Sequence, residues 1–275
     1  MNVKKVVLFP NLKKKGAKEV ISFLKKSLKE RKIKIEKKIS SQSDLIIAIG
    51  GDGTILKAVR EIKNGRTLLL GVNLGDVGFL TTTTREKLNE SLDDVLAKNF
   101  LVSPRLMLKV QMRRESSSRL NCFCLNEIVL MRKGARMLSL KISGRKGKIG
   151  EFCVDGLIIA TPTGSTGHSL SAGGPFVFPE EELIILTPIC SVSLTSRPLI
   201  ISANERLRIE LNSPCANLTV DGQENFLLTK RDFLLIEKAP FSLKLIDVSK
   251  KGYFQLLREK LGWETRSFTP AARSQ

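Results

Sequence analysis

One short segment constrains the fold of this chain more than any other. Residues 45–49 form a fully apolar run, and the sequence G-G-D-G-T follows directly at residues 50–54. A short apolar run without interruption is typical of a parallel strand that is buried on both faces. Residues 55–62 then show a helical pattern. A buried strand, a glycine-rich turn and a helix in direct succession predict an α/β domain in which the turn lies at the carboxyl end of a strand.

The same alternation of strands and helices continues through the first hundred residues. Leu88, Leu92 and Leu96 recur at four-residue spacing, which favours a helix with one apolar face. The alternation predicts a doubly wound, Rossmann-like α/β domain over residues 1–100. Its expected strands cover residues 3–9, 33–39, 45–49 and 68–72, and its expected helices cover residues 15–31, 55–62 and 86–98.

The pattern changes after Pro104, where short strand-like runs replace the alternation. Polar or glycine-containing turns separate several of these runs, and only residues 254–261 suggest a helix. We therefore predict a boundary near residue 101, an all-β domain over residues 101–263 and a flexible polar tail over residues 264–275. The expected strands cover residues 106–112, 123–130, 138–142, 157–161, 207–211 and 233–236.

The chain of 275 residues has a formal net charge of +19, which raises the question of a nucleic-acid partner. Much of the excess lies in residues 13–38, where lysines interleave with apolar residues at helical spacing and so form the solvated face of an amphipathic helix. Only 13 Phe, 1 Tyr and 1 Trp accompany the charge, with no pattern of aromatic residues between the basic ones. We therefore predict that the protein binds no nucleic acid.

The sequence also bears on compartment and on the role of the cysteines. No apolar run reaches the roughly 20 residues that span a bilayer, which predicts a soluble, cytoplasmic protein without membrane contact. The five cysteines are an odd number, and we expect them to be reduced. Cys122 and Cys124 would share one face of a strand, but a C-x-C pair without a second pair or a histidine is weak evidence for a metal site. Small apolar fillers are the simpler interpretation.

The G-G-D-G-T turn is a candidate phosphate-binding loop formed by Gly50, Gly51, Gly53 and Thr54. Glycines let the main chain approach a phosphate closely, and the helix that follows presents free N–H groups and a positive dipole end to an anion. No G-K-[ST] sequence follows, so the turn is not a P-loop. Asp52 would repel a phosphate, but it can accept a proton from an attacking hydroxyl or help to hold a metal ion. The alternative is a structural turn in which Asp52 caps the helix.

The G-G-D-G-T turn resembles a loop shared by NAD kinases, diacylglycerol- and sphingosine-type lipid kinases and phosphofructokinases. It therefore indicates a class of chemistry and no particular substrate. Further segments resemble NAD kinases specifically. Residues 71–81 are close to G-x-N-x-G-x-x-G-F-L-T, and residues 155–175 follow D-G-x-x-x-x-T-P-T-G-S-T-A-Y-x-x-S-A-G-G-P. The pair Asn126-Glu127 and the stretches R-P-L at 197–199 and D-G-Q at 221–223 are similar to elements of the same family.

The resemblance implies an ATP-dependent NAD kinase, which transfers the terminal phosphate of ATP to the 2′-hydroxyl of the adenosine ribose of NAD. It implies a β-sandwich as the second domain, an active site between the domains, and a homodimer or homotetramer. Asp52 would be the proton acceptor. Magnesium would arrive with ATP, or with polyphosphate as in some relatives, and no dedicated protein cage would hold it. The residues expected at the NAD site are Asp52, Gly53, Phe79, Asn126, Glu127, Arg136, Asp155, Thr166, Gly167, His168, Ser171 and Gln223.

Gly167 and His168 depart from the family pattern, which usually has Ala-Tyr at these positions. The histidine ring still offers a flat surface and a hydrogen bond, so the change is compatible with NAD binding. His168 is the single histidine of the chain and so belongs to no histidine metal cluster. Two other interpretations are a lipid kinase that shares only the G-G-D-G-T loop, and a non-enzymatic protein that binds polyanions through its charge.

Overall fold

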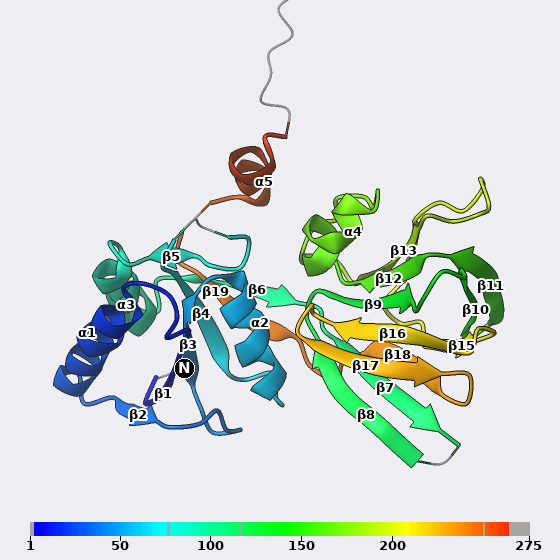
Figure 1. Ribbon diagram of the computed structural model, residues 1–275. Helices are drawn as coiled ribbons and strands as arrows, with labels where there is room; N and C mark the ends of the chain where they lie inside the picture. The colour runs from blue at the N-terminus through cyan, green and yellow to red at the C-terminus, as the bar shows by residue number, and fades with distance from the viewer. Residues whose placement is uncertain (1–2, 76–77, 116, 250, 264–275) are drawn as a thin grey trace, which may run out of the picture.

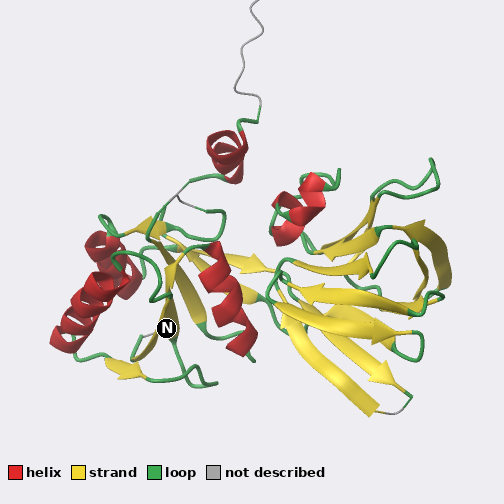
Figure 2. Cartoon of the chain, viewed as in Figure 1, coloured by secondary structure: helices red, strands yellow, loops and turns green. Residues whose placement is uncertain are grey.

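The computed structural model describes residues 3–75, 78–115, 117–249 and 251–263. The predicted tail at residues 264–275 and two positions of the 71–81 segment, Asp76 and Val77, lie outside these ranges. The described chain forms an α/β part and a β-rich part that lie side by side (Figure 1). Colouring by secondary structure shows that most of the helix belongs to the first part and most of the strand to the second (Figure 2).

A seven-stranded sheet forms the core of the α/β part. Its strands are β1 (Lys5–Pro10), β2 (Lys34–Glu36), β3 (Leu45–Gly50), β4 (Leu68–Asn73), β5 (Thr83–Thr84), β6 (Leu101–Arg105) and β19 (Leu243–Asp247). The spatial order is β2-β1-β3-β4-β19-β6, with β5 paired to β4. All pairs are parallel except β19 with β6. β3 is buried along its whole length, as its apolar sequence predicts.

Three helices cover this sheet: α1 (Ala17–Glu30), α2 (Asp52–Glu61) and α3 (Leu88–Ala97). The apolar residues of α1 and α3 form one cluster with the sheet, whereas those of α2 belong to a separate cluster with other strand residues. The predicted doubly wound α/β fold is therefore confirmed. α2 begins at Asp52, three residues before the predicted start, so the aspartate is itself the first residue of the helix. None of the described helices is long and apolar enough to cross a membrane.

Two strands of this sheet come from the region that the sequence analysis assigned to the second domain. β6 directly follows the predicted boundary at residue 101, and β19 is more than a hundred residues further along the chain. They pair with each other, and β19 also pairs with β4. This corrects the expected range of 101–263 for the all-β part: the chain leaves the first sheet after Arg105 and returns to it at Leu243. The sequence of a short strand does not indicate which distant strand it will pair with, because such pairing is decided only by the tertiary fold.

Two six-stranded antiparallel sheets form the β-rich part. One contains β7 (Leu108–Arg114), β8 (Ser117–Cys124), β10 (Leu138–Gly144), β11 (Gly147–Val154), β15 (Leu207–Leu211) and β18 (Phe233–Lys238). The other contains β9 (Glu127–Arg132), β12 (Gly156–Ala160), β13 (Leu183–Ile189), β14 (Leu199–Ser202), β16 (Cys215–Val220) and β17 (Glu224–Thr229). The largest apolar cluster of the protein draws on both sheets, so the predicted β-sandwich is confirmed.

Two detailed predictions for this part are wrong. The single strand expected at 123–130 is broken at Leu125 and Asn126, where the chain passes from β8 in one sheet to β9 in the other. A helix was expected in this region only at residues 254–261, but the segment after β12 also forms a 3-10 turn, η1 (Thr163–Thr166), and a short helix, α4 (His168–Ser171). Elements of four residues are too short to show a helical repeat of apolar positions, so the sequence contains no sign of them.

An apolar interface joins the two parts behind α2. Met107 and Leu125 of the β-rich part belong to the same buried cluster as Ile55 of the helix. An ion pair between Arg60 on α2 and Glu224 on β17 crosses the same boundary. The interface therefore fixes the strand break at Leu125 and Asn126 against the helix that begins at Asp52.

The C-terminal helix, α5 (Tyr253–Leu261), lies apart from both sheets, above the junction between the two parts (Figure 1). Tyr253 donates a hydrogen bond from its hydroxyl to the carbonyl oxygen of Val177, at 3.1 Å. Its ring also packs at 5.0 Å, edge-on, against the ring of Phe178. These contacts attach α5, which follows the last strand of the first sheet, to the segment after α4 in the β-rich part.

Candidate active site

Asp52 lies where the chain turns from β3 into α2. Both oxygens of its carboxylate accept main-chain hydrogen bonds: the Phe79 nitrogen lies 2.8 Å from Oδ2 and the Leu80 nitrogen lies 3.1 Å from Oδ1. Gly78 must lack a side chain, because a Cβ atom there would lie 2.1 Å from Asp52 Oδ1. The segment that follows β4 is therefore built closely around this aspartate.

The environment of Asp52 makes its carboxylate a better proton acceptor than an exposed aspartate. Burial raises the pKa of Asp52 above its ordinary value, while hydrogen bonds from the amides of residues 79–81 and the positive charge of Lys260 act in the opposite direction. The first effect is the largest, so the pKa remains raised. A carboxylate with a raised pKa accepts a proton more readily.

The remaining residues of the G-G-D-G-T turn shape the loop and leave space above it. Thr54 is buried, and its hydroxyl oxygen accepts a hydrogen bond from the Gly51 amide at 3.4 Å. A Cβ atom on Gly50 would lie 2.1 Å from the same hydroxyl, so threonine closes the turn from inside. A Cβ atom on Gly51 would meet nothing within 4 Å. An anion in that open space would lie at the N-terminal end of α2.

The turn also lies at the topological switch point of the sheet. β1 and β3 are neighbours, and the chain leaves them toward α1 and α2, which pack in different clusters. Such switch points are where open α/β sheets bind ligands. The Leu74 amide donates to the Gly50 carbonyl at 3.0 Å, which ties the end of β4 to the same edge. A cavity of about 330 Å³ opens there, lined by Lys15, Gly16, Asn73, Leu74, Gly75, Thr84, Arg85 and Glu86.

Asp221 organises the facing edge of the β-rich part. Its carboxylate accepts hydrogen bonds from three successive amides, those of Leu125 at 2.9 Å, Asn126 at 2.7 Å and Glu127 at 3.2 Å. The side chain is only 2% exposed, and its backbone adopts a left-handed φ of +49°. Sequence reasoning did not single out Asp221, although the D-G-Q stretch around it resembled the family. Its role is to hold the strand break at residues 125–127 in one conformation.

Asn126 and Glu127 are held by Asp221 and keep polar atoms for a ligand. Among the described residues, Asn126 Oδ1 and Glu127 Oε2 are buried and have no hydrogen-bond partner. Burial and, second, the neighbouring charge of Asp221 raise the pKa of Glu127 to about 7. Buried polar atoms without partners are rare in folded proteins, so two at one place indicate a site that a ligand completes.

The segment after β12 packs directly on this pair. The Thr161 hydroxyl donates to the Leu125 carbonyl at 2.5 Å, and the Thr161 amide donates to the Asn126 carbonyl at 2.8 Å. A Cβ atom on Gly164 would lie 2.2 Å from the Asn126 carbonyl oxygen, so only glycine allows this approach. Gly167 is also close, since a Cβ atom there would lie 3.4 Å from Glu127 Oε2. The T-P-T-G-S-T run is thus a scaffold around Asn126 and Glu127.

Further contacts connect the two edges into one site. The side-chain nitrogen of Gln223 would lie 3.8 Å from a Cβ atom on Gly53, so the D-G-Q turn reaches the residue next to Asp52. Phe79 and Thr166 line the same small cavity. His168 and Ser171 lie on α4, one turn beyond Thr166, and both are exposed. The structure therefore gathers Asp52, Gly53, Phe79, Asn126, Glu127, Thr166, Gly167 and Gln223 at the junction of the two parts.

Asp155 and Arg136 are not part of this gathering. Glu127 pairs with Ala160 at one end of β9 and β12, whereas Gly156, next to Asp155, pairs with Met131 at the other end. The Asp155 carboxylate instead forms an ion pair with Arg132 at 2.6 Å. Arg136 is exposed in the turn that follows β9. A strand of six residues separates these side chains from Glu127 by about 17 Å within one chain.

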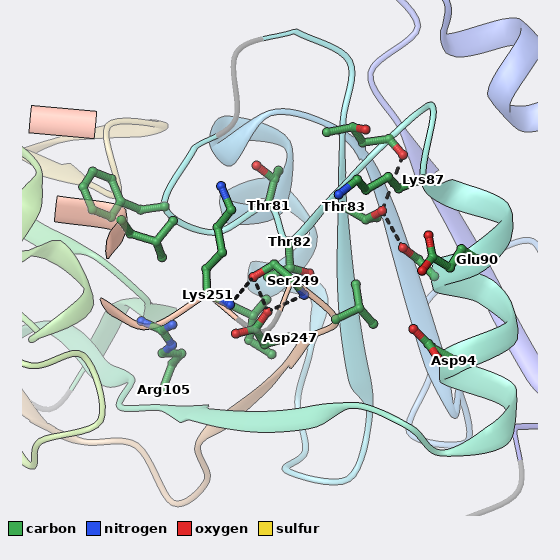
Figure 3. A pocket seen from close by; sticks show the side chains of 16 residues that line it. Thr81, Thr82, Thr83, Lys87, Glu90, Asp94, Arg105, Asp247, Ser249 and Lys251 are labelled. Carbon is green, nitrogen blue, oxygen red and sulfur yellow. Dashed lines mark hydrogen bonds between the residues drawn. The ribbon is translucent and has the colours of Figure 1, made fainter. Parts of the chain in front are cut away.

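A second cavity, of about 310 Å³, lies beside Phe79 at the carboxyl edge of the first sheet (Figure 3). Arg105, the last residue of β6, lines this cavity and also the small cavity that contains Phe79 and Thr166. Sequence reasoning missed Arg105 because nothing around it forms a motif. Its importance arises only because β6 joins the first sheet.

The described residues offer little to a metal ion by themselves. No group of three or more His, Cys, Asp or Glu side chains within those ranges could hold a metal. All five cysteines are free thiols, and burial raises the pKa of Cys122 to about 11, which opposes the thiolate that a metal requires. Magnesium usually binds through one or two carboxylates together with substrate phosphates and water. Asp52, in the glycine-rich turn at the start of α2, is one carboxylate that fits that arrangement.

Sequence comparison places these features in a known family. Residues 9–100 match the family model for the ATP-NAD kinase N-terminal domain, and residues 125–248 match that for the ATP-NAD kinase C-terminal domain. An NAD kinase of Syntrophotalea carbinolica is 42% identical over 232 residues, which are 83% of this chain and 81% of the relative. An NAD kinase of Magnetococcus marinus is 39% identical over 229 residues, which are 82% of this chain and 75% of the relative.

Solved structures share the architecture as well. Yeast NADH kinase complexed with NADH superposes with a TM-score of 0.83 at 24% identity, covering 98% of this chain and 91% of that one. An NAD kinase from Archaeoglobus fulgidus in complex with ATP superposes with a TM-score of 0.74 at 26% identity, covering 94% and 97%. By its domain matches, its relatives and the geometry around Asp52, the chain belongs to the ATP-NAD kinase family.

Proposed function

We propose that the protein transfers the terminal phosphate of ATP to the 2′-hydroxyl of the adenosine ribose of NAD, forming NADP and ADP. One observation carries this proposal: Asp52, a carboxylate with a raised pKa, lies between a phosphate-binding loop and a pair of unpartnered polar side chains. NAD would occupy the edge with Asn126 and Glu127, and ATP the edge with Gly50 and Gly51. The names of the relatives agree with both substrates.

The polar atoms of the second edge suit an adenosine. Asn126 Oδ1 and Glu127 Oε2 are acceptors without a partner among the described residues, whereas an adenine amino group and ribose hydroxyls are donors. Gln223 lies next to Gly53 and would contact the ribose near the reacting hydroxyl. We assign Phe79, Thr166, Gly167, His168 and Ser171 to the remaining surface of NAD. The exposed ring of His168 would lie against the base, in place of the usual tyrosine.

The donor phosphates need positive charge, since the loop contains no P-loop lysine. The N-terminal end of α2 supplies part of it. Lys15 and Arg85 line the cavity next to Gly50, so they would face the phosphates of ATP. Lys260 on α5 adds positive charge that acts on Asp52. Magnesium bound to the phosphates would neutralise further charge during the transfer.

In the reaction, the Asp52 carboxylate would accept the proton of the ribose 2′-hydroxyl as that oxygen attacks the terminal phosphorus of ATP. A new P–O bond forms to the ribose, and the bond from the terminal phosphorus to the β,γ-bridging oxygen breaks. The electron pair of that bond leaves with ADP. The Phe79 and Leu80 amides fix both carboxylate oxygens, so the base is oriented before the substrate arrives.

We also propose that Asp155 and Arg136 serve the NAD site of a second copy in a homodimer or homotetramer. Within one chain they lie at the far end of β9 and β12 from Glu127. The segment that follows β13 lies near Asp155, since the Val192 amide donates to the Cys153 carbonyl, and it exposes Val192 and Leu194. Exposed apolar side chains of this kind favour contact with another subunit. We further propose that the protein acts in the cytoplasm, without nucleic-acid or membrane partners.

A coupled assay tests the proposed reaction. The purified chain is incubated with ATP, Mg²⁺ and NAD, and NADP is measured with an NADP-specific dehydrogenase. We expect formation of NADP that depends on all three components. Absence of NADP above the blank, with several metals and with polyphosphate as an alternative donor, would contradict the proposal. Phosphorylation of a long-chain alcohol instead would favour the lipid-kinase interpretation.

A further inference from the structure

The cavity of about 310 Å³ beside Phe79 has no role in the reaction described above. Residues 81–84 and α3 form one wall (Figure 3). Arg105, Asp247, Val248, Ser249 and Lys251 form the other. Leu256 of α5 completes the lining. The volume lies at the lower end of the range of small-molecule sites, and the lining mixes apolar and polar groups as such sites do.

Arg105 is the notable cation of this cavity. Its Nε atom is buried without a hydrogen-bond partner, and in the described parts of the chain its guanidinium forms no ion pair. Burial lowers the pKa of Arg105, and the negative charges of Glu180, Asp247 and Tyr253 oppose that effect. A buried guanidinium nitrogen without a partner is costly, and the planar fork of donors of an arginine fits a phosphate or a carboxylate.

The other charged groups of the cavity differ in how far they are already engaged. Lys251 forms an ion pair with Glu259 at 2.6 Å, and Asp247 accepts hydrogen bonds from the amide and hydroxyl of Ser249. On the opposite side, α3 presents the carboxylates of Glu90 and Asp94 (Figure 3). An anionic group would therefore find Arg105, and hydroxyl groups at its other end would find acceptors on α3.

We propose that this cavity binds a phosphorylated polyol of the size of a sugar phosphate, with its phosphate on Arg105 and its hydroxyls facing Glu90 and Asp94. We expect the ligand to act as an effector of the kinase, because one wall of the cavity contacts the segment that holds the Asp52 carboxylate. Thr81 lines the cavity, and its hydroxyl accepts hydrogen bonds from the Gly78 amide at 3.0 Å and from Asn73 at 3.2 Å. Movement of Thr81 is thus transmitted to the segment whose amides hold the catalytic carboxylate.

The first test measures binding, so it does not depend on kinase activity. Ribose 5-phosphate, inorganic phosphate and ribose are titrated into the full chain by calorimetry, with and without saturating NAD and ATP. We expect ribose 5-phosphate to bind with the highest affinity of the three, and to bind whether or not the substrates are present. Arg105→Gln should weaken that binding about tenfold or more, because it removes the charged anchor. Arg113→Gln is the matched control, since its Nε is also buried without a partner but it lies on β7.

A second variant covers the case in which Arg105→Gln does not fold. Glu90 is exposed on α3, so Glu90→Phe should be tolerated and should block the cavity without touching Arg105. We expect it to abolish binding of ribose 5-phosphate. In the kinase assay, ribose 5-phosphate should change turnover at least twofold in the unmodified chain and in Arg113→Gln, and leave Glu90→Phe unaffected.

Several results would overturn the inference. The first is that none of the three probes binds at about 10 mM, tenfold above a typical metabolite concentration. The second is that both Arg105→Gln and Glu90→Phe still bind ribose 5-phosphate. The third is that NAD or ATP displaces the bound ribose 5-phosphate. The last result would assign the cavity to the substrate site. Loss of NADP formation with intact binding of ribose 5-phosphate would instead contradict only the proposed reaction.

Discussion

Two aspartates, one on each side of the active site, accept hydrogen bonds from the main chain in much the same way. Asp52 binds the amides of Phe79 and Leu80, and Asp221 binds three successive amides from Leu125 onward. For both, burial raises the pKa and the amide hydrogen bonds oppose that effect. By chemistry alone the two carboxylates would be hard to tell apart.

Access separates them. Asp221 is 2% exposed, and its carboxylate is surrounded by the strand break it supports. Asp52 is only partly buried and stands at the start of a helix, beside the open space over Gly51. A reacting hydroxyl can therefore reach one aspartate and not the other. Anchoring of a carboxylate by main-chain amides therefore serves catalysis at Asp52 and architecture at Asp221.

Replacing Asp52 should have the largest effect on activity. In Asp52→Ala we expect turnover to fall by about 10²-fold or more, the range for loss of a general base, with NAD affinity within about tenfold of the unmodified value. Steady-state kinetics and direct NAD binding measure the two quantities. Turnover equal to that of the unmodified chain would remove Asp52 from its catalytic role and favour a protein that only binds nucleotides.

Replacing Asp221 should mainly affect stability and NAD affinity. Asp221→Asn replaces one carboxylate oxygen, which accepts hydrogen bonds, with an NH₂ group, which only donates them. Buried main-chain N–H groups at the strand break then lose their acceptor. We expect the free energy of unfolding to fall by about 2–4 kcal/mol and the KM for NAD to rise, with a smaller loss of kcat than in Asp52→Ala. Chemical denaturation and kinetics check this. A loss of kcat at unchanged stability would mean that Asp221 also takes part in the chemistry.

Replacing Lys260 should change the pKa of Asp52 without altering the hydrogen bonds of its carboxylate. Its positive charge lowers the pKa of Asp52, so Lys260→Gln should raise that pKa and move the acid limb of the kcat–pH profile to higher pH. On the acid limb of the profile, turnover should fall about threefold to tenfold, and Lys260→Arg should restore it. Arg258→Gln, on the exposed side of the same helix, is the control. Equal profiles for the two glutamine variants would exclude Lys260 from the site.

Glu127 should produce the smallest effect, visible as a pH dependence. Its pKa of about 7 means that the carboxylate ionises as the pH rises through neutrality, and the ionised form is the better acceptor for ribose hydroxyls. We expect the KM for NAD to fall about threefold between pH 6 and pH 8, and Glu127→Gln to flatten this change. Because the folded pKa is raised, this group's contribution to stability is complete below pH 4.5 and is lost as the pH rises toward 7.

Much of the fold follows from patterns that are local in the chain. The apolar run at 45–49 predicts the buried strand β3, and leucines at four-residue spacing predict α3. The G-G-D-G-T turn is found at the carboxyl end of β3, as expected. Where a pattern is incomplete, the prediction is wrong. The strand expected at 123–130 is broken because Asp221, 96 residues after Leu125, binds the amides at the break.

In the candidate site, too, some features follow from local sequence and others only from the tertiary structure. The sequence by itself determined the residue types of the site, because the motifs around Asp52, Asn126 and Gly164 are continuous in the chain. Only the tertiary structure decided that Asp52 is held by the Gly78–Leu80 segment, that Asp221 holds Asn126 and Glu127, and that Arg105 faces a cavity. It also decided that Asp155 lies far from Glu127. The physical reason is that hydrogen bonds and burial join residues that are neighbours in space, and no short motif records which distant segments will meet.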